Sequence, residues 1–148
     1  MDKLFEKLKE SSIDDFYVIE AEFFEHLYQL EPTQKTSEII VFLNISNWLG
    51  FSLRDGVWTY YEVANPLELQ TTLDYLKQLD VQMATFFQLG IHDYQNPQYS
   101  ENYNYPDEWI IESEKIDDWI FQHEKYIWKF EKNLLLKHEK EITKAFGG

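Results

Sequence analysis

The segment Arg54–Glu62, RDGVWTYYE, places an Asp-Gly turn signal directly in front of a cluster of aromatic residues. The stretches before and after it carry apolar residues at the spacing of an amphipathic helix. A tight turn between two helices, with aromatic side chains just behind it, is typical of a packing corner. We therefore predict that Arg54–Glu62 joins two helices and that its aromatic side chains lie in the core.

The same helical spacing continues along most of the chain. Between residues 14 and 30, for example, Phe16, Phe23 and Leu27 recur at intervals of four and seven. Aromatic content would also allow a strand over 56–64, but Pro66, which suits the first turn of the next helix, favours a short helix there. We predict an all-α, single-domain bundle of about six or seven helices over residues 1–148, with helices at 14–30, 33–53, 56–64, 66–80, 81–91, 109–121 and 127–146.

Composition excludes several classes of site. The chain has no cysteine, so it offers neither a disulfide nor a thiolate. Its five glycines form no phosphate-binding loop and no nucleophile elbow. A net charge of −14 disfavours direct binding to nucleic acid or to anionic membranes. With no signal peptide and no apolar run near the roughly 20 residues that span a bilayer, we expect a cytoplasmic protein without a cofactor.

The acidic residues gather in two groups. Between Glu10 and Glu31 there is no lysine or arginine, and on a helix several of the acidic side chains would form a stripe without basic partners. Asp14–Asp15 and Asp117–Asp118 also suit the start of a helix, where carboxylates complement the helix dipole. Two interpretations stay open: a surface kept for solubility, or one that meets a basic partner. The candidate partner-binding residues are Asp14, Asp15, Glu22, Glu25, Asp107, Glu108, Asp117 and Asp118.

Histidines provide the alternative chemistry. His26 follows Glu22 by four residues, so the two could share one helix face and, with other carboxylates, bind a metal. An exposed helix pair explains them more simply, and we expect no metal. His123 and His138 lack the second histidine of a zinc motif, and we interpret them as solvated helix-face residues. His92 could act as a base, but Asp93 beside it is poorly placed to orient it.

Residues 93–107 form one long irregular stretch that contains four tyrosines, Tyr94, Tyr99, Tyr103 and Tyr105. Rigid amphipathic rings of this kind suit a contact loop. They can equally lie across the core with their hydroxyls in water, which is the interpretation we favour. Three tryptophans elsewhere could serve a homodimer contact if they are exposed: Trp109, Trp119 and Trp128.

The corner segment also resembles a motif of a bacterial family. Gly56, Val57, Tyr60 and Tyr61 match the Gly, Phe, Tyr and Phe positions of an Asn-Gly-Gly-Phe-x-Gln-Tyr-Phe-like element, and a helix follows in both. The family consists of small acidic proteins whose named member is a DNA mimic that binds a helix-turn-helix repressor. This chain departs from the motif in two places: Arg54 and Asp55 replace its Asn-Gly, and Thr59 replaces its Gln. The resemblance implies an all-helical protein whose surface carboxylates imitate DNA phosphates.

These observations lead to one functional hypothesis and two alternatives. We expect a non-enzymatic protein that binds a basic partner through its carboxylates, such as a DNA-binding regulator, as a DNA mimic does. An immunity protein that neutralises a basic nuclease toxin would use the same electrostatics. The alternative from another class is a metal-dependent hydrolase built on His26, Glu22 and nearby carboxylates.

Overall fold

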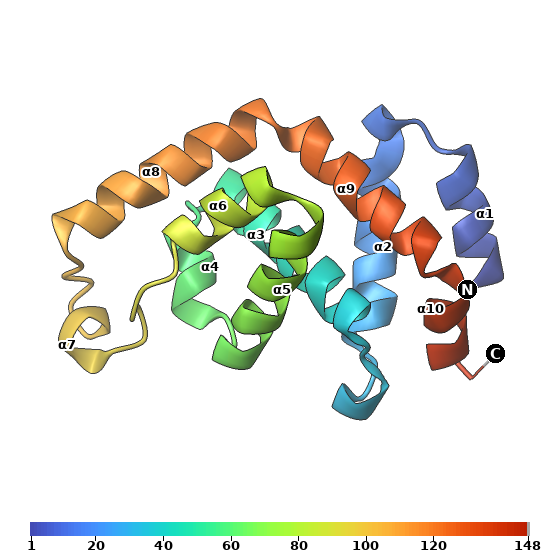
Figure 1. Ribbon diagram of the computed structural model, residues 1–148, viewed down its shortest axis with the longest axis horizontal. Helices are drawn as coiled ribbons and strands as arrows, with labels where there is room; N and C mark the ends of the chain where they lie inside the picture. The colour runs from blue at the N-terminus through green and yellow to red at the C-terminus, as the bar shows by residue number, and fades with distance from the viewer. Residues whose placement is uncertain (148) are drawn as a thin grey trace. The chain divides into compact units, whose positions relative to one another are not determined.

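The computed structural model describes residues 1–147, and within them every regular element is a helix (Figure 1). The all-α prediction is confirmed. There are ten α-helices and two short 3-10 helices in these residues, so the predicted count of six or seven is wrong. Internal contacts divide the chain into two compact units, residues 1–46 with the chain from Glu124 onward, and residues 47–123. The single domain expected over residues 1–148 stays a prediction.

The first unit packs around a cluster of phenylalanines. Helices α1 and α2 contact each other, and α9 contacts both (Figure 1). Phe23 lies at the centre: its ring is 5.0 Å from Phe5 and 6.4 Å from Phe42, edge to face in both cases. The elements are α1 (Asp2–Glu10), η1 (Ile13–Asp15), α2 (Phe16–Tyr28), η2 (Pro32–Gln34), the first part of α3 (Ser37–Arg54), α9 (Glu124–Lys137) and α10 (Glu139–Ala145).

The second unit is organised by a buried hydrogen-bond chain. The indole N–H of Trp48 donates to the Tyr61 hydroxyl at 2.9 Å, which in turn donates to the Phe87 carbonyl at 2.7 Å. Because all three side chains are buried, these bonds satisfy polar groups that burial would otherwise penalise. The elements are the rest of α3, α4 (Trp58–Val63), α5 (Pro66–Leu79), α6 (Val81–Leu89), α7 (Pro97–Ser100) and α8 (Asp107–Gln122), with α6 packed on both α5 and α8.

Local signals placed most helix ends correctly. Asn65 caps α5 ahead of Pro66, and the Thr36 side chain accepts a bond from the Ile39 N–H as α3 begins. The extra helices have three sources: α1, the single turn α7, and a break near His138 that divides the predicted helix 127–146 into α9 and α10. Helix α1 was missed although Leu4, Phe5 and Leu8 form its buried face, because the charged residues between them dominate so short a segment.

His123 and His138 are each followed by a glutamate. Both lie at helix junctions rather than on solvated helix faces, which corrects their interpretation. His123 ends α8: its Nδ1–H donates to the Trp119 carbonyl at 2.8 Å, and its ring stacks on the Trp119 indole at 4.4 Å. His138 lies half-buried between α9 and α10. In each case the following glutamate opens the next helix, where its charge complements the helix dipole.

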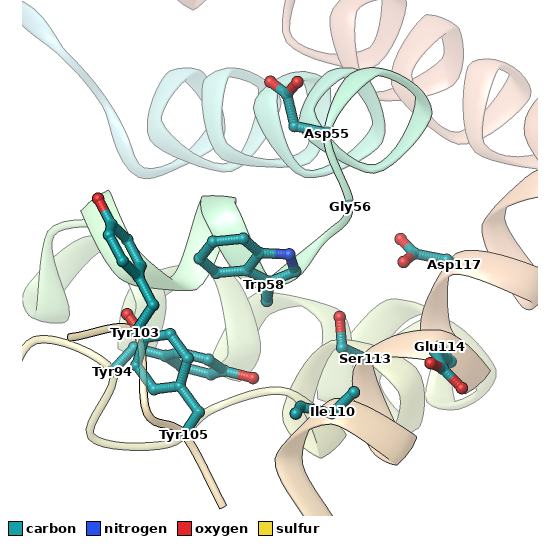
Figure 2. A pocket seen from close by; sticks show the side chains of 10 residues that line it. All are labelled: Asp55, Gly56, Trp58, Tyr94, Tyr103, Tyr105, Ile110, Ser113, Glu114 and Asp117. Atoms are coloured by element: carbon teal, nitrogen blue, oxygen red, sulfur yellow. The ribbon is translucent and has the colours of Figure 1, made fainter. Parts of the chain in front are cut away.

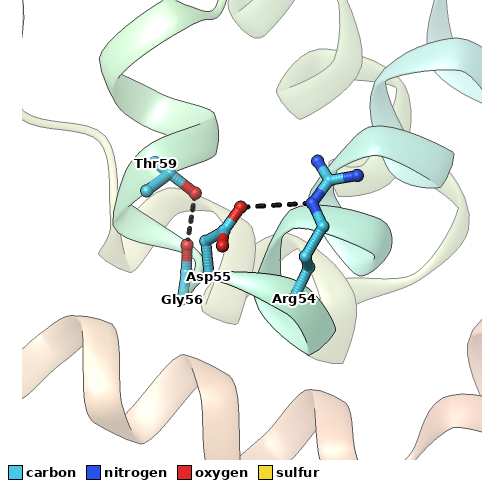
Figure 3. Close-up of polar contacts among 4 residues, drawn as sticks. All are labelled: Arg54, Asp55, Gly56 and Thr59. Atoms are coloured by element: carbon cyan, nitrogen blue, oxygen red, sulfur yellow. Dashed lines mark hydrogen bonds and ion pairs between the residues drawn. The ribbon is translucent and has the colours of Figure 1, made fainter.

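The corner Arg54–Glu62 is built around Gly56. The N–H groups of Asp55 and Gly56 both donate to the Phe51 carbonyl, at 2.8 and 3.0 Å, which ends α3. Gly56 has φ = +100°, a value that residues with a Cβ rarely adopt. The Thr59 hydroxyl then donates to the Gly56 carbonyl at 2.6 Å as α4 begins (Figure 3).

We predict that Gly56→Ala lowers the free energy of unfolding by at least about 1 kcal/mol, because alanine is strained at this φ. Its Cβ would also lie 3.1 Å from Cδ1 and Nε1 of Trp58. Gly50→Ala is the matched control: Gly50 is exposed in α3 with nothing within 4 Å of an added Cβ, so alanine should stabilise the protein by up to about 1 kcal/mol. Urea unfolding of both variants tests this, and equal effects would contradict it.

Candidate functional site

A cavity of about 380 Å³ lies within the second unit, and we call it the Trp58 pocket (Figure 2). Its volume falls at the small end of the range of about 300–1,000 Å³ that ligand pockets occupy, which suits a small ligand or one long side chain. The lining residues are Asp55, Gly56, Trp58, Tyr94, Tyr103, Tyr105, Ile110, Ser113, Glu114 and Asp117.

Two stretches far apart in the sequence form this pocket, the corner with α4 and the loop before α8 with α8 itself. The corner supplies Asp55 and Gly56, and α4 supplies Trp58. The loop before α8 supplies Tyr103 and Tyr105. Helix α8 contributes one face, because residues three and four apart lie on the same side of a helix: Ile110, Ser113, Glu114 and Asp117.

Aromatic rings form one side of the pocket. The Trp58 indole lies 5.8 Å from the Tyr105 ring and 6.3 Å from the Tyr103 ring, with interplanar angles of 53° and 79°. The Tyr105 hydroxyl donates to Glu62 at 2.6 Å, and burial together with this carboxylate raises the pKa of Tyr105 above its ordinary value. Tyr103 has φ = +51°, a left-handed conformation that is uncommon for a residue with a side chain and that concentrates at functional sites.

Asp117 lies on the α8 side of the pocket, and its hydrogen bonds link that side to the corner. Its Oδ1 accepts two hydrogen bonds, from the Ser52 hydroxyl at 2.6 Å and from the Val57 N–H at 2.9 Å. Burial raises the pKa of Asp117, and the two hydrogen bonds oppose that rise because they favour the carboxylate. Its Oδ2 makes no hydrogen bond within residues 1–147 and lies 3.7 Å from where a Cβ on Gly56 would be. One oxygen therefore anchors the corner while the other faces the pocket wall.

The charge of the pocket is negative. Asp55, Glu114 and Asp117 line it, whereas no Lys, Arg or His is among its lining residues. Arg54 offsets part of this charge, since its Nε lies 3.1 Å from Oδ2 of Asp55 on the exposed side of the corner (Figure 3). Glu114 and Asp117 have no such ion pair in the part of the chain that the structure describes. The pocket thus combines aromatic faces with uncompensated carboxylates.

In the first unit the predicted acidic stripe is not free of basic partners, and that expectation is wrong. Asp14 pairs with Lys125 at 2.7 Å, and Glu22 lies 3.7 Å from Lys7. The lysines come from α1 and α9, outside the window in which the sequence shows none. Two further candidates of this group, Asp15 and Glu25, are exposed, and Asp15 accepts a hydrogen bond from the Ser12 hydroxyl.

In the second unit the four candidates separate into two kinds. Asp107 and Glu108 are exposed in the first turn of α8, where carboxylates complement the helix dipole. Asp117 and Asp118 lie well inside α8, so their predicted position at a helix start is wrong. Asp118 is exposed, whereas Asp117 is half-buried beneath the corner.

The motif residues lie in the core of the corner. Val57, Tyr60 and Tyr61 are buried, with Val57 held by Asp117 and Tyr61 by the Trp48 hydrogen bond. Burial raises the pKa of Tyr60 and of Tyr61 above the ordinary tyrosine value. Together with Gly56 they position Trp58 at the pocket without lining it themselves, except for Gly56.

Histidines and carboxylates do not converge on a metal site. Among residues 1–147 no group of three or more His, Asp or Glu side chains could hold a metal ion. His26 packs edge to face against Phe146 at 6.3 Å, while Glu22 lies near Lys7. His92 does have a carboxylate partner, but it is Glu112, 3.0 Å from Nε2 and twenty residues away, rather than Asp93.

The aromatic residues of the irregular stretch divide between core and surface. Tyr94 is buried, where burial raises its pKa to about 12, whereas Tyr103 is 68% exposed. Core packing therefore describes Tyr94, and the contact-loop interpretation fits Tyr103 better. Trp119 is buried under Phe86 and His123, so it does not meet the condition of exposure, and a homodimer contact through Trp109 or Trp128 stays a prediction.

Sequence reasoning missed the residues that make the pocket a site. Trp58 was counted with the core aromatics, and Ser113 and Ile110 were not considered. A usable signal was present: Ile110, Ser113, Glu114 and Asp117 follow helical spacing on α8 and so share one face of that helix. Nothing in the sequence indicates that this face meets Trp58.

A second group of carboxyls lies inside the first unit. Glu131 is completely buried, and no Lys, Arg, His or N–H group bonds either of its oxygens within residues 1–147. Its one partner is the largely buried carboxyl of Glu20, which also bonds Ser46. A bond between two carboxyls requires a proton, and burial raises the pKa of Glu131 well above its ordinary value, with Glu20 raising it further. We infer a proton shared between the two.

No family model, curated protein or solved structure matches this chain. The resemblance to the DNA-mimic family therefore stays a prediction. No helix within residues 1–147 is both long enough and apolar enough to cross a bilayer.

The shared proton predicts that stability depends on pH. Because the folded pKa of Glu131 is raised, its protonated form supports the fold at low pH, and that support is lost as the pH rises through the folded pKa. We expect Glu131→Gln, which stays neutral, to gain stability relative to the natural protein at about pH 8 but not at about pH 5. The gain should grow as the pH rises above the ordinary glutamate pKa and level off once the pH passes the folded pKa.

Chemical denaturation at the two pH values measures this effect. Glu25→Gln is the control, because Glu25 is exposed on α2, the helix that carries Glu20. It should change stability equally at both pH values. A pH-independent effect of Glu131→Gln would show that the buried pair does not hold a proton.

Proposed function

We propose that this chain is a non-enzymatic acidic protein that binds a basic protein partner and receives one of the partner's cationic side chains in the Trp58 pocket. The observation that carries the proposal is the lining of that pocket, which has three carboxylates, four aromatic rings and no cationic side chain. Aromatic faces and carboxylates both attract cations, and in a partly enclosed cavity the two attractions reinforce each other.

The charge of the whole chain supports a basic partner. A net charge of −14 produces a field that attracts positively charged proteins and raises their association rate. The exposed carboxylates of the first unit that lie in ion pairs contribute less to this field than the unpaired ones, because Lys7 and Lys125 offset Glu22 and Asp14. The surface therefore supplies attraction at a distance, while the pocket supplies a defined point of contact.

Two kinds of basic protein fit this chemistry, a DNA-binding regulator and a nuclease. Both present lysine and arginine side chains at the spacing of DNA phosphates, and an array of carboxylates can occupy those side chains in place of DNA. The resemblance of Gly56, Val57, Tyr60 and Tyr61 to a DNA-mimic motif favours the regulator. No observation favours the metal-dependent hydrolase, because His26 packs against Phe146 and Glu22 lies near Lys7.

The binding prediction is tested by affinity capture from a bacterial lysate at about 50 and about 300 mM salt, with the purified protein as bait. We expect a basic DNA-binding protein or nuclease to be retained at low salt and lost at high salt, because salt screens exposed charges over about 8–10 Å. DNA added in excess should release it. Capture that resists both salt and DNA would contradict the proposal.

Paired variants separate the pocket from the general acidic surface. Glu114→Gln with Asp117→Asn removes two charges from the pocket, whereas Glu108→Gln with Asp118→Asn removes two exposed charges from the same helix. The pocket pair should lose at least about tenfold in affinity for the captured partner, and the surface pair about twofold or less. Equal losses would show that the pocket is not the point of contact.

A further inference from the structure

The pocket also constrains which cation it can take. We infer that the Trp58 pocket binds a primary alkylammonium group, the end of a lysine side chain, in preference to a guanidinium group. That the lysine belongs to a basic partner protein rests on the proposed function, whereas the test of the inference does not.

The rings favour a compact cation. Trp58, Tyr103 and Tyr105 meet at interplanar angles of 53° and 79°, so they form walls of a cage rather than two parallel faces. In Figure 2 the Trp58 indole lies between the tyrosines and the carboxyl of Asp117. A planar guanidinium stacks best flat against one ring, whereas a rounded ammonium can touch several tilted faces at once. The geometry therefore suits the ammonium group.

The fixed carboxylate favours the same choice. A guanidinium prefers a carboxylate with two free oxygens, because it donates two parallel bonds. Asp117 offers only Oδ2, since Oδ1 already accepts from Ser52 and Val57. Oδ2 of Asp55 is likewise taken by Arg54. An ammonium acts as a point charge with three donors and needs only one oxygen from each partner.

Ser113 supplies a second, uncharged acceptor. It is only 4% exposed, and its hydroxyl makes no hydrogen bond with any residue of 1–147. Figure 2 shows this hydroxyl directed into the pocket. The hydroxyl oxygen is nevertheless accessible from the pocket, where it can accept a bond from a ligand or from water. An ammonium group held by Asp117 can also donate to Ser113, while Ile110 provides an apolar surface for the methylene stem.

The test uses small cations and no partner protein. The purified protein is titrated with n-butylammonium chloride, n-propylguanidinium chloride and n-butanol at constant ionic strength, and the indole N–H resonance of Trp58 is followed by NMR. Trp58→Phe assigns that resonance by removing it. We expect saturable binding of n-butylammonium with a Kd of about 1–10 mM, propylguanidinium at least about threefold weaker, and no saturable binding of n-butanol.

Two neighbouring substitutions locate the binding. Asp117→Asn keeps an oxygen for Ser52 and Val57 but replaces the free oxygen by an amide, so it should weaken n-butylammonium at least about tenfold. Asp118→Asn removes the same charge from an exposed position one residue away and should change the affinity about twofold or less. Ser113→Ala should weaken n-butylammonium but leave tetramethylammonium, which cannot donate a hydrogen bond, unchanged.

Three results would overturn the inference: no saturable binding of n-butylammonium, propylguanidinium binding as tightly or more tightly, or equal losses in Asp117→Asn and Asp118→Asn. The titration contains no partner, so its failure is distinguishable from failure of the proposed function. Partner capture with no ammonium binding removes only the pocket assignment. Ammonium binding with no captured basic protein removes the proposed function and keeps the site.

Discussion

The second unit depends on the two hydrogen bonds that Oδ1 of Asp117 accepts from Ser52 and Val57. These bonds join α8 to the end of α3 and to the first residue after the Gly56 turn, over about sixty residues of chain. A half-buried carboxylate without donors would lose solvation and gain nothing in return. Because both donors converge on one oxygen, the bonds fix the corner and leave the other oxygen for a different use.

Asp117 therefore serves both the fold and the pocket, with one oxygen for each. The corner must be tight for Val57 to reach Asp117, and the positive φ of Gly56 makes it tight. The same turn brings the Trp58 indole against Gly56, where it forms a wall of the pocket. The strained conformation of Tyr103 lies on the other side of that indole. Gly56 takes its positive φ without strain, whereas Tyr103 does not, and strained residues of this kind cluster at ligand sites.

The sequence predicted what local chemistry determines. Helical periodicity and the proline at the start of α5 placed most of the helices, and the Asp-Gly signal placed the corner. Contacts between residues that are distant in the sequence could not be predicted from these local signals. The lysine partners of Asp14 and Glu22, the Glu112 partner of His92 and the Asp117 bond to Val57 all join residues at least fifteen positions apart. Periodicity indicates that a face is buried but does not indicate what covers it.

Aspartate and glutamate side chains thus have three different physical roles in this chain. Asp14 and Glu22 lie in exposed ion pairs with lysines, which contribute little to stability and reduce the negative charge of the surface around them. Glu20 and Glu131 are buried together, where burial raises the pKa of both carboxyls and so favours their neutral forms. In the pocket, Asp117 is held in place by two hydrogen bonds and has no ion pair within residues 1–147. Electrostatic attraction is strongest where charge is fixed, partly desolvated and unpaired. A count of acidic residues therefore cannot locate a binding site for a cation, whereas their partners can.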